Sequence, residues 1–338
     1  MTENPASTPI DAVIMWVDGA DPVHAEKLDA FLQSRGLARS GGASKARFHH
    51  AGELDYCITS LLKFAPWLRT IFIVTDEQTP AFLDKLVGTE FEQRVRVVDH
   101  KIIFAGVESA LPNFNSMAIS SLLWRIPGIA EQFLYLNDDF MLIRPTSSQD
   151  FFRGDNVVLR GKWNLLPEEV PGAPLIKWVR KLLRREGKKK RVSFWALQQA
   201  CARLLGFRKK YFRLPHVPHA WKKSSWAQIF DEFPCAVDTN IHAPLRGPDQ
   251  FVPEALCSHF HWRENLVCLD NSRTNMQLKP AEQSLFRIAA KLREADNSEH
   301  IIFACVQSIE ASPAEKQKMI FSWLDGRIGT LEDLLQKK

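Results

Sequence analysis

The first half of the chain alternates short apolar runs with stretches in which apolar residues recur at helical spacing. The apolar runs predict buried strands over residues 10–17, 68–76, 94–100 and 132–142. Between the first two, "GELDYCITSLLKF" has apolar residues three or four positions apart, which predicts a helix that Pro66 ends. Apolar strands that alternate with helices are typical of a parallel sheet covered on both faces. We therefore predict an α/β fold with a mostly parallel sheet and helices on both faces.

Beyond residue 155 the pattern is less regular. "VVLRGKW" predicts a strand, residues 174–207 contain helical stretches, and "HVPHAWKKSSWAQIFDEFP" predicts a loop leading into a helix. "SHFHWRENLVCLDNS" predicts a strand with His259 and His261 on one face. We expect a disordered N-terminus (1–9), an α/β domain (10–275) with a basic helical insertion at about 170–212, and a C-terminal helical segment (276–338).

The net charge of +5 comes from one segment. Residues 177–191 hold nine Lys or Arg and one acid, Glu186, so this segment carries +8 and the rest of the chain −3. It is either a solvated face or a surface that attracts anionic lipid headgroups or a polyanionic substrate. Since no nucleic-acid-binding module accompanies it, we expect no nucleic-acid partner.

The apolar runs and the cysteines bear on the compartment. No run approaches the roughly 20 apolar residues that span a bilayer. The six Cys form no CxxC pair, and we see no signal peptide. We therefore expect reduced thiols in a cytoplasmic protein.

Acidic residues follow three of the predicted strands. Asp18 follows "VIMWV", Asp76 follows "IFIVT", and Asp138 and Asp139 follow "FLYLN". Ligands of an open parallel α/β sheet bind beyond the carboxyl ends of its strands, and carboxylates there suit Mg²⁺ or Mn²⁺ held jointly with phosphate oxygens. The alternative is that Asp18 and the Asp138-Asp139 pair only cap turns. Asp76 is left unassigned.

Histidines form a second group of candidates. His216 and His219 lie in "PHVPHAW", and "IHAPLRGPDQF" adds His242, Arg246 and Asp249. A histidine beside carboxylates and an arginine suits proton abstraction from a hydroxyl, with the arginine holding phosphate. A packing role for each histidine stays open, and the Cys and His spacings do not match a structural zinc site.

Taken together, these motifs resemble the Stealth family of sugar-phosphate transferases. The resemblance rests on "IDAVIMWVDGADP", on "RFHHAGELDYCITSLLKFAPWLRTIFIVTDEQTP" and its continuation through "NDDF", on "HVPHAWKKSSWAQIFDEFP" with "LRGPDQF", and on "LVCLDNS". It implies a GT-A-like nucleotide-sugar-binding fold. It also implies transfer of a sugar 1-phosphate from a UDP-sugar to a hydroxyl of a saccharide or phosphosaccharide acceptor. UMP is released, and the product is a capsular polysaccharide or an exopolysaccharide.

The resemblance also implies roles for individual residues. The metal ligands would be Asp138, Asp139 and Asp270, and the catalytic residues His219 as base, Arg246 against phosphoryl charge, and Asp139. The substrate-binding residues would be Asp18, Gly19, Asn115, Asn137, His216, Asp249 and Asn271. The segment 177–191 would touch the anionic polymer or the inner face of the plasma membrane.

The chain departs from the family pattern at several positions. The family commonly has Arg-Tyr-Ser where Asp55 begins "DYC", and often Glu and His in the region of Ser120, Leu122 and Trp124. The order of Asp270 and the following Asn also differs. Two alternatives therefore stand beside phosphotransfer: a metal-dependent glycosyltransferase that releases UDP, and a non-catalytic carbohydrate-binding relative.

Overall fold

The computed structural model describes residues 8–37, 52–172 and 193–336. The basic segment 177–191 lies outside the described residues. Among the helices of the described part, none combines the length and the hydrophobicity needed to cross a bilayer.

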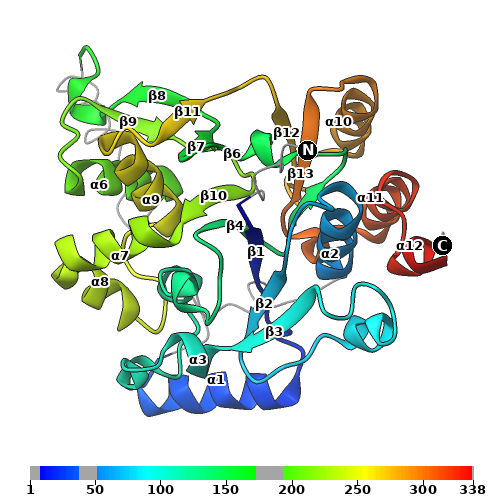
Figure 1. Cartoon of the computed structure of the whole chain (residues 1–338), viewed down its shortest axis with the longest axis horizontal. Helices are drawn as coiled ribbons and strands as arrows, with labels where there is room; N and C mark the ends of the chain where they lie inside the picture. The colour runs from blue at the N-terminus through cyan, green and yellow to red at the C-terminus, as the bar shows by residue number, and fades with distance from the viewer. Residues whose placement is uncertain (1–7, 38–51, 173–192, 337–338) are drawn as a thin grey trace, which may run out of the picture.

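A five-stranded sheet forms the centre of the molecule (Figure 1). Its strands lie in the order β10-β4-β1-β2-β3, with the bounds β1 (Ile10–Met15), β2 (Ile71–Thr75), β3 (Val95–Asp99), β4 (Gln132–Asn137) and β10 (His219–Lys222). β1 to β4 are parallel, and β10 runs antiparallel to β4. The predicted α/β fold with a mostly parallel sheet is confirmed.

The parallel strands end level with one another. Met15 at the end of β1 pairs with Asn137 at the end of β4, and Thr75 at the end of β2 pairs with Asp99 at the end of β3. The segments that follow these strands therefore meet at one edge of the sheet, which is the edge where the predicted site lies.

Helices lie to either side of the sheet in Figure 1. On one side are α2 (Glu53–Phe64) and α11 (Ala314–Arg327), and on the other are α7 (Lys223–Glu232) and α8 (Pro234–Ile241). α2 is the amphipathic helix that the sequence predicts, and its apolar face is buried. The remaining helical elements of the first half are α1 (Pro22–Ser34), η3 (Ala81–Leu86), α3 (His100–Ile103), η4 (Glu108–Ala110), α4 (Ser116–Ser120), η5 (Leu123–Arg125) and η6 (Ser148–Asp150).

Three smaller sheets adjoin the central one. Their strand orders are β11-β7-β6, β12-β13-β5 and β8-β9. The elements not yet given are β5 (Phe140–Leu142), β6 (Phe152–Arg153), β7 (Asn156–Leu159), β8 (Lys162–Leu165), η7 (Pro167–Glu169), α6 (Phe194–Leu204), β9 (Lys210–Arg213), α9 (Pro253–Arg263), β11 (Val267–Leu269), β12 (Thr274–Leu278), α10 (Leu285–Asn297), β13 (Ile301–Val306), η8 (Ile309–Ala311) and α12 (Leu331–Gln336).

The sequence pattern predicts a helical C-terminal segment, but in the structure this segment also contains strands. It contains α10, α11 and α12, but also most of β12 and the whole of β13. All six residues of β13 are buried, and the strand pairs antiparallel with β5. A short apolar run such as "IIFACV" does not by itself distinguish a strand from part of a helix. Its partner strand lies far away along the chain, so the pairing is invisible to local pattern.

Two local predictions in the second half are wrong. His219 does not lie in a loop but opens β10, because the edge of β4 provides hydrogen-bond partners for it. His259 and His261 lie on helix α9 rather than on a strand. Pro253 at the first position of α9 favours a helix start. Both histidines are buried, and they alternate with aromatic residues along the chain. The same alternation is expected of a strand, which explains the wrong prediction.

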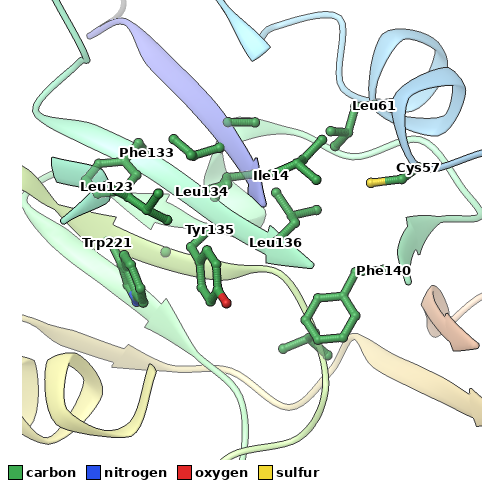
Figure 2. Close-up of a cluster of buried hydrophobic side chains, with 14 of the residues drawn as sticks. Ile14, Cys57, Leu61, Leu123, Phe133, Leu134, Tyr135, Leu136, Phe140 and Trp221 are labelled. Atoms are coloured by element: carbon green, nitrogen blue, oxygen red, sulfur yellow. The ribbon is translucent and has the colours of Figure 1, made fainter. Parts of the chain in front are cut away.

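Figure 2 shows the apolar cluster around β4. Phe133, Leu134 and Leu136 are buried between Ile14 of β1 and neighbouring elements. Each side chain buried in this way contributes about 1.5–3 kcal/mol to stability. The strand that leads into the acidic turn is therefore held firmly in place.

One acid of the central sheet is fully buried near the start of β1. Asp11 accepts hydrogen bonds from Arg69 (Nε–Oδ1, 2.9 Å; Nη2–Oδ2, 2.6 Å) and from the backbone N–H groups of Thr70 (3.1 Å) and Ala130 (2.7 Å). Both carboxylate oxygens are thus satisfied within the protein.

Candidate active site

The acidic turn joins two sheets. β4 of the central sheet ends at Asn137, residues Asp138 and Asp139 form the turn, and the chain then enters β5, which pairs with β13. Because the two acids lie in a turn, the alternation of side chains along a strand does not constrain them. The N–H of Val306 donates to the Asp139 carbonyl (3.0 Å), which fixes the turn to the C-terminal sheet.

The surroundings of the turn disfavour negative charge. Burial raises the pKa of Asp139 to about 7, and the nearby carboxylates of Glu53 and Glu310 add to this effect. Burial also raises the pKa of Asp138, and Asp139 and Glu53 contribute. Part of each acid remains accessible to solvent, so the pair is recessed rather than sealed. A cation would relieve this crowding of carboxylates.

Two buried thiols flank the turn. The Sγ of Cys305 in β13 lies 3.6 Å from Oδ2 of Asp139, and the Sγ of Cys57 in α2 lies 4.0 Å from the Asn137 carbonyl oxygen. The other carboxylate oxygen, Oδ1 of Asp139, is buried and has no hydrogen-bond partner among the described residues. A buried carboxylate oxygen without a partner costs stability unless a ligand or metal ion satisfies it.

The chemistry of this pair fits a divalent cation shared with a ligand. Within residues 8–37, 52–172 and 193–336, no three His, Cys, Asp or Glu side chains are arranged to hold a metal ion. The structure therefore does not bring Asp138, Asp139 and Asp270 together as a three-residue metal site. Mg²⁺ commonly binds one or two protein carboxylates and takes its other ligands from substrate phosphates and water. Asp138 and Asp139 fit that arrangement.

Asp270 and Asn271 have partners within the protein. Asp270 forms an ion pair with Arg153, and its Oδ1 accepts from the Ser272 N–H (2.8 Å). Hydrogen bonds from Ser272 and the Arg153 charge lower the pKa of Asp270 to about 2. Asn271 bonds both the N–H and the carbonyl of Gly161 (2.8 and 3.0 Å). Gly161 has φ +140°, and a Cβ there would collide with the Arg213 carbonyl.

Asn115 has hydrogen-bond partners within the protein. It is fully buried, its Oδ1 accepts from the Met117 N–H (3.1 Å), and its Nδ2 donates to the Ala243 carbonyl (2.8 Å). It therefore caps α4 and ties that helix to the loop after α8.

The turn after β1 holds Asp18 and Gly19 at the same edge of the sheet. Gln78 stabilises this turn through two hydrogen bonds. Its Oε1 accepts from the Asp18 N–H (2.8 Å), and its Nε2 donates to the Asp18 carbonyl (2.9 Å). The Asp18 carboxylate accepts from the Ala20 N–H (2.8 Å). The Asp76 carboxylate lies near the basic side chains of Lys27 (2.6 Å) and His24 (3.3 Å).

His216 and His219 lie beside the acidic turn. The ring of His219 stacks on Tyr135 with centroids 6.3 Å apart, and both histidines pack edge-on to Phe140. Burial lowers the pKa of His219 to about 3 and that of His216 to about 4. Both rings are therefore neutral at pH 7.

Arg246 lies in the loop that follows α8. It donates to the Ser116 hydroxyl. Its side chain is exposed, and desolvation by the surrounding protein lowers the pKa of the guanidinium. Asp249, three residues further on, is exposed in the same loop.

Tyr135 connects these groups, and the sequence pattern does not single it out. Its hydroxyl donates to Oδ1 of Asn137 (2.8 Å), and its ring stacks on Trp221. Figure 2 shows the hydroxyl at the edge of the apolar cluster. Burial raises the pKa of this hydroxyl well above its usual range, and the charges of Glu254 and Asp139 add to this effect. Tyr135 is a buried residue of the apolar strand β4. The sequence pattern therefore assigns its ring to the hydrophobic core rather than to a site.

Two further histidines of the second half, His259 and His261, are buried and have hydrogen-bond partners within the protein. His259 accepts from the Phe212 N–H (Nε2, 2.9 Å) and donates to the Ala255 carbonyl (Nδ1, 2.7 Å). His261 bonds the Ser225 hydroxyl (3.1 Å). His242 is exposed and lies 3.0 Å from Asp238.

Two family models match the chain. Stealth protein conserved region 1 matches residues 8–36, and Stealth protein conserved region 2 matches residues 47–159. The matched regions include Asp18 and the Asn137-Asp138-Asp139 turn. His219 and Arg246 lie beyond them.

Curated relatives carry related names. An exopolysaccharide phosphotransferase of Streptomyces coelicolor is 38% identical over 244 residues, which is 71% of this chain and 24% of that protein. A second one from that organism is 36% identical over 253 residues, 75% of this chain and 40% of that protein. The capsular polysaccharide phosphotransferase LcbA of Aeromonas hydrophila is 38% identical over 151 residues, 44% of this chain and 40% of that protein. The chain thus spans well under half the length of these relatives.

Among solved structures, the galactosyltransferase LgtC in complex with donor and acceptor sugar analogs overlaps 95% of this chain and 97% of its own. The identity is 15% and the TM-score 0.46, so this likeness supports no conclusion about the chemistry of the chain.

Proposed function

Because the chain belongs to the family of Stealth proteins, we propose that it transfers a sugar 1-phosphate from a UDP-sugar to a hydroxyl of a saccharide acceptor. UMP would be released, and the product would be a phosphodiester in a capsular polysaccharide or an exopolysaccharide. The observation that carries this proposal is the recessed Asp138-Asp139 pair at the carboxyl edge of the parallel strands, with the buried Oδ1 of Asp139 unsatisfied among the described residues. The phosphotransferase names of the relatives support the reaction type.

Asp138 and Asp139 would hold the cofactor, Mg²⁺ or Mn²⁺, together with the donor. Bound there, the ion would neutralise charge on the diphosphate oxygens. Asn137, held by the Tyr135 hydroxyl, would contact the sugar or orient the two acids. Asp18 and Gly19, at the end of β1, would contact the nucleotide.

Arg246 would stabilise charge on the transferred phosphoryl group. Phosphoryl transfer depends mainly on positioning and on neutralising the equatorial oxygens, and a guanidinium does both.

His219 would accept the proton of the acceptor hydroxyl. Its pKa of about 3 makes the ring a weak base in the free protein. A diphosphate bound beside it would raise that pKa, since negative charge stabilises the imidazolium. His219 would therefore become an effective base only when the donor is bound.

The reaction would take place where nucleotide sugars are found, on the cytoplasmic side of the plasma membrane. Contact of the basic segment 177–191 with that membrane or with the anionic polymer is part of the same proposal.

The test is to measure the nucleotide released from a panel of UDP-sugars with a saccharide acceptor, with and without Mg²⁺. Metal-dependent UMP that disappears in Asp139→Asn supports the proposal. UDP would instead identify a glycosyltransferase, and neither nucleotide from any donor would favour a non-catalytic saccharide-binding protein. The matched control is Asp231→Asn, an exposed acid on α7 whose loss should leave the release unchanged.

A further inference from the structure

A cavity separate from the acidic turn lies between the first turns of α2 and the C-terminal helices. Its volume is about 330 Å³, which falls within the range of small-molecule sites, about 300–1,000 Å³. The side chains that define it come from α2 (Asp55, Tyr56 and Thr59) and from the region of α11 and α12 (Phe321, Thr330 and Glu332).

This cavity is on the opposite side of α2 from the acidic turn. At about 100° per residue, Asp55, Tyr56 and Thr59 share one face of the helix. Cys57, whose thiol reaches the Asn137 carbonyl, lies roughly on the other face. The two sites are therefore separated by the thickness of the helix.

One wall of the cavity is aromatic. The rings of Tyr56 and Phe321 stack, with centroids 5.9 Å apart and planes 23° from parallel. The Tyr56 hydroxyl donates to Asp325 (2.6 Å), which fixes the ring. A rigid aromatic wall suits the C–H face of a sugar ring, which loses water on packing against it.

The polar wall is acidic and includes a buried hydroxyl. Asp55 and Glu332 contribute carboxylates, and Lys85 forms an ion pair with Glu332 from outside the lining. Thr59 is 1% exposed, and its Oγ1 has no hydrogen-bond partner among the described residues. The lining contains no Lys or Arg among the described residues, so phosphate groups are disfavoured. Carboxylates and hydroxyls are suitable partners for sugar hydroxyls or for an amino group.

We propose that this cavity binds an uncharged or amino-bearing saccharide ring. In the context of the proposed function, on which this assignment rests, the cavity is a subsite that holds part of the acceptor chain away from the reacting hydroxyl. The excess of carboxylates makes it unsuited to the UDP-sugar donor.

The experiment measures binding rather than turnover. Saturation-transfer NMR and titration on the whole chain would use the methyl glycosides of glucose, N-acetylglucosamine and glucosamine, with glucose 1-phosphate and UDP as anionic probes. At least one methyl glycoside should bind, and Phe321→Ala should weaken that binding about tenfold. UDP binding should be unchanged. Phe286→Ala, which removes an aromatic ring that is 77% exposed on α10, is the matched control.

Thr59→Val is a second variant, which tests the cavity without an expected loss of stability. Replacing a buried hydroxyl that lacks a partner by a methyl group should leave the melting temperature unchanged or raise it. The same change should lower the glycoside affinity several-fold. Unchanged glycoside affinity in both Phe321→Ala and Thr59→Val would overturn the proposal, as would the failure of every methyl glycoside to bind.

Wild type and Asp139→Asn together separate this inference from the proposed function. Glycoside binding by a wild-type protein that releases no UMP from any UDP-sugar would sustain the cavity assignment while the proposed transfer fails. Glycoside binding that vanishes in Asp139→Asn and persists in Phe321→Ala would place the saccharide at the acidic turn instead and overturn the cavity assignment.

Discussion

Asp11, near the start of β1, and Asp139, just beyond β4, are both acids of the central sheet, but their surroundings differ. Asp11 is fully buried, and both of its oxygens accept hydrogen bonds from Arg69 and from backbone N–H groups. Asp139 has a single thiol near Oδ2 and no partner for Oδ1 among the described residues. The first carboxylate is satisfied by the fold, whereas the second is left for a ligand.

The difference follows from the direction of the strands. At the amino edge of the sheet, the loop before β2 provides the Arg69 side chain and the Thr70 N–H group to Asp11. The loop before β4 provides the Ala130 N–H group. At the carboxyl edge, the turn is flanked by Glu53 and by thiols that are weak donors. A buried charge without donors is therefore informative about function, whereas a buried charge with donors is not.

The largest expected effect is on stability at the amino edge. Asp11→Ala should lower the free energy of unfolding by about 3–5 kcal/mol, because it leaves Arg69 and two backbone N–H groups without their acceptor. Urea denaturation measures this value. Asp155→Ala, at an acid that is 92% exposed, should change it by less than about 0.5 kcal/mol. A similarly small change in Asp11→Ala would remove the contrast.

The second effect is on activity at the carboxyl edge. Asp139→Asn should lower the transfer rate at least about 100-fold, because the metal–diphosphate loses a charged ligand. Its free energy of unfolding at pH 8 should stay the same or rise by on the order of 1 kcal/mol, since an unsatisfied charge is removed. Steady-state kinetics and denaturation of one preparation measure both. Destabilisation as large as that of Asp11→Ala would mean that Asp139 is structural.

A third effect, on the dependence of stability on pH, sharpens the comparison. The pKa of Asp139 is about 7 in the folded protein and about 3.9 in the unfolded chain. The folded state therefore binds more protons between these values, and this group's contribution to the free energy of unfolding falls as pH rises from about 4 to 7. The slope is at most about 1.4 kcal/mol per pH unit.

The measurement for this third effect is the difference between wild type and Asp139→Asn in urea midpoints across that range. Buried histidines such as His219, whose pKa is lowered to about 3, have the opposite pH dependence, but they are common to both proteins and cancel. A difference that does not vary with pH would contradict the raised pKa.

The smallest expected effect concerns the support of the turn. Tyr135→Phe removes the hydrogen bond to Asn137, which should cost about 0.5–1.5 kcal/mol of stability. We expect kcat to fall several-fold while KM for the donor changes little, because Asn137 loses its orientation. Tyr211→Phe, at another buried tyrosine, is the control and should leave kcat unchanged. Equal kinetics in both variants would limit Tyr135 to packing.

The sequence predicts the parallel strands of the central sheet well, because β1, β2 and β4 are nearly continuous apolar runs and their acidic ends follow directly. It does not predict β10 or β13, because each strand exists through pairing with a distant segment. The sequence therefore predicts His219 in a loop, although it lies in β10. The contacts of Asp139 with Cys305 and Val306 were equally invisible, since no local pattern relates β13 to the turn.

The sequence identifies the acidic turn but not the partners of Asp270 and Asn271. An amide or acid next to a strand has the same appearance whether it pairs with an arginine, bonds a backbone group or binds a ligand. In the structure, Asp270 pairs with Arg153 and Asn271 bonds Gly161.

The pairing of β5 with β13 has a consequence for the order of events during synthesis. Asp139 and the Cys305 that approaches it are 166 residues apart. At about 5–20 residues per second, roughly 8–30 s of translation separate the two. The nascent chain can build the parallel strands early, but the acidic turn has no β13 to fix it until residues 301–306 have been synthesised. A ligand that depends on the fixed turn would therefore bind only after that point in translation.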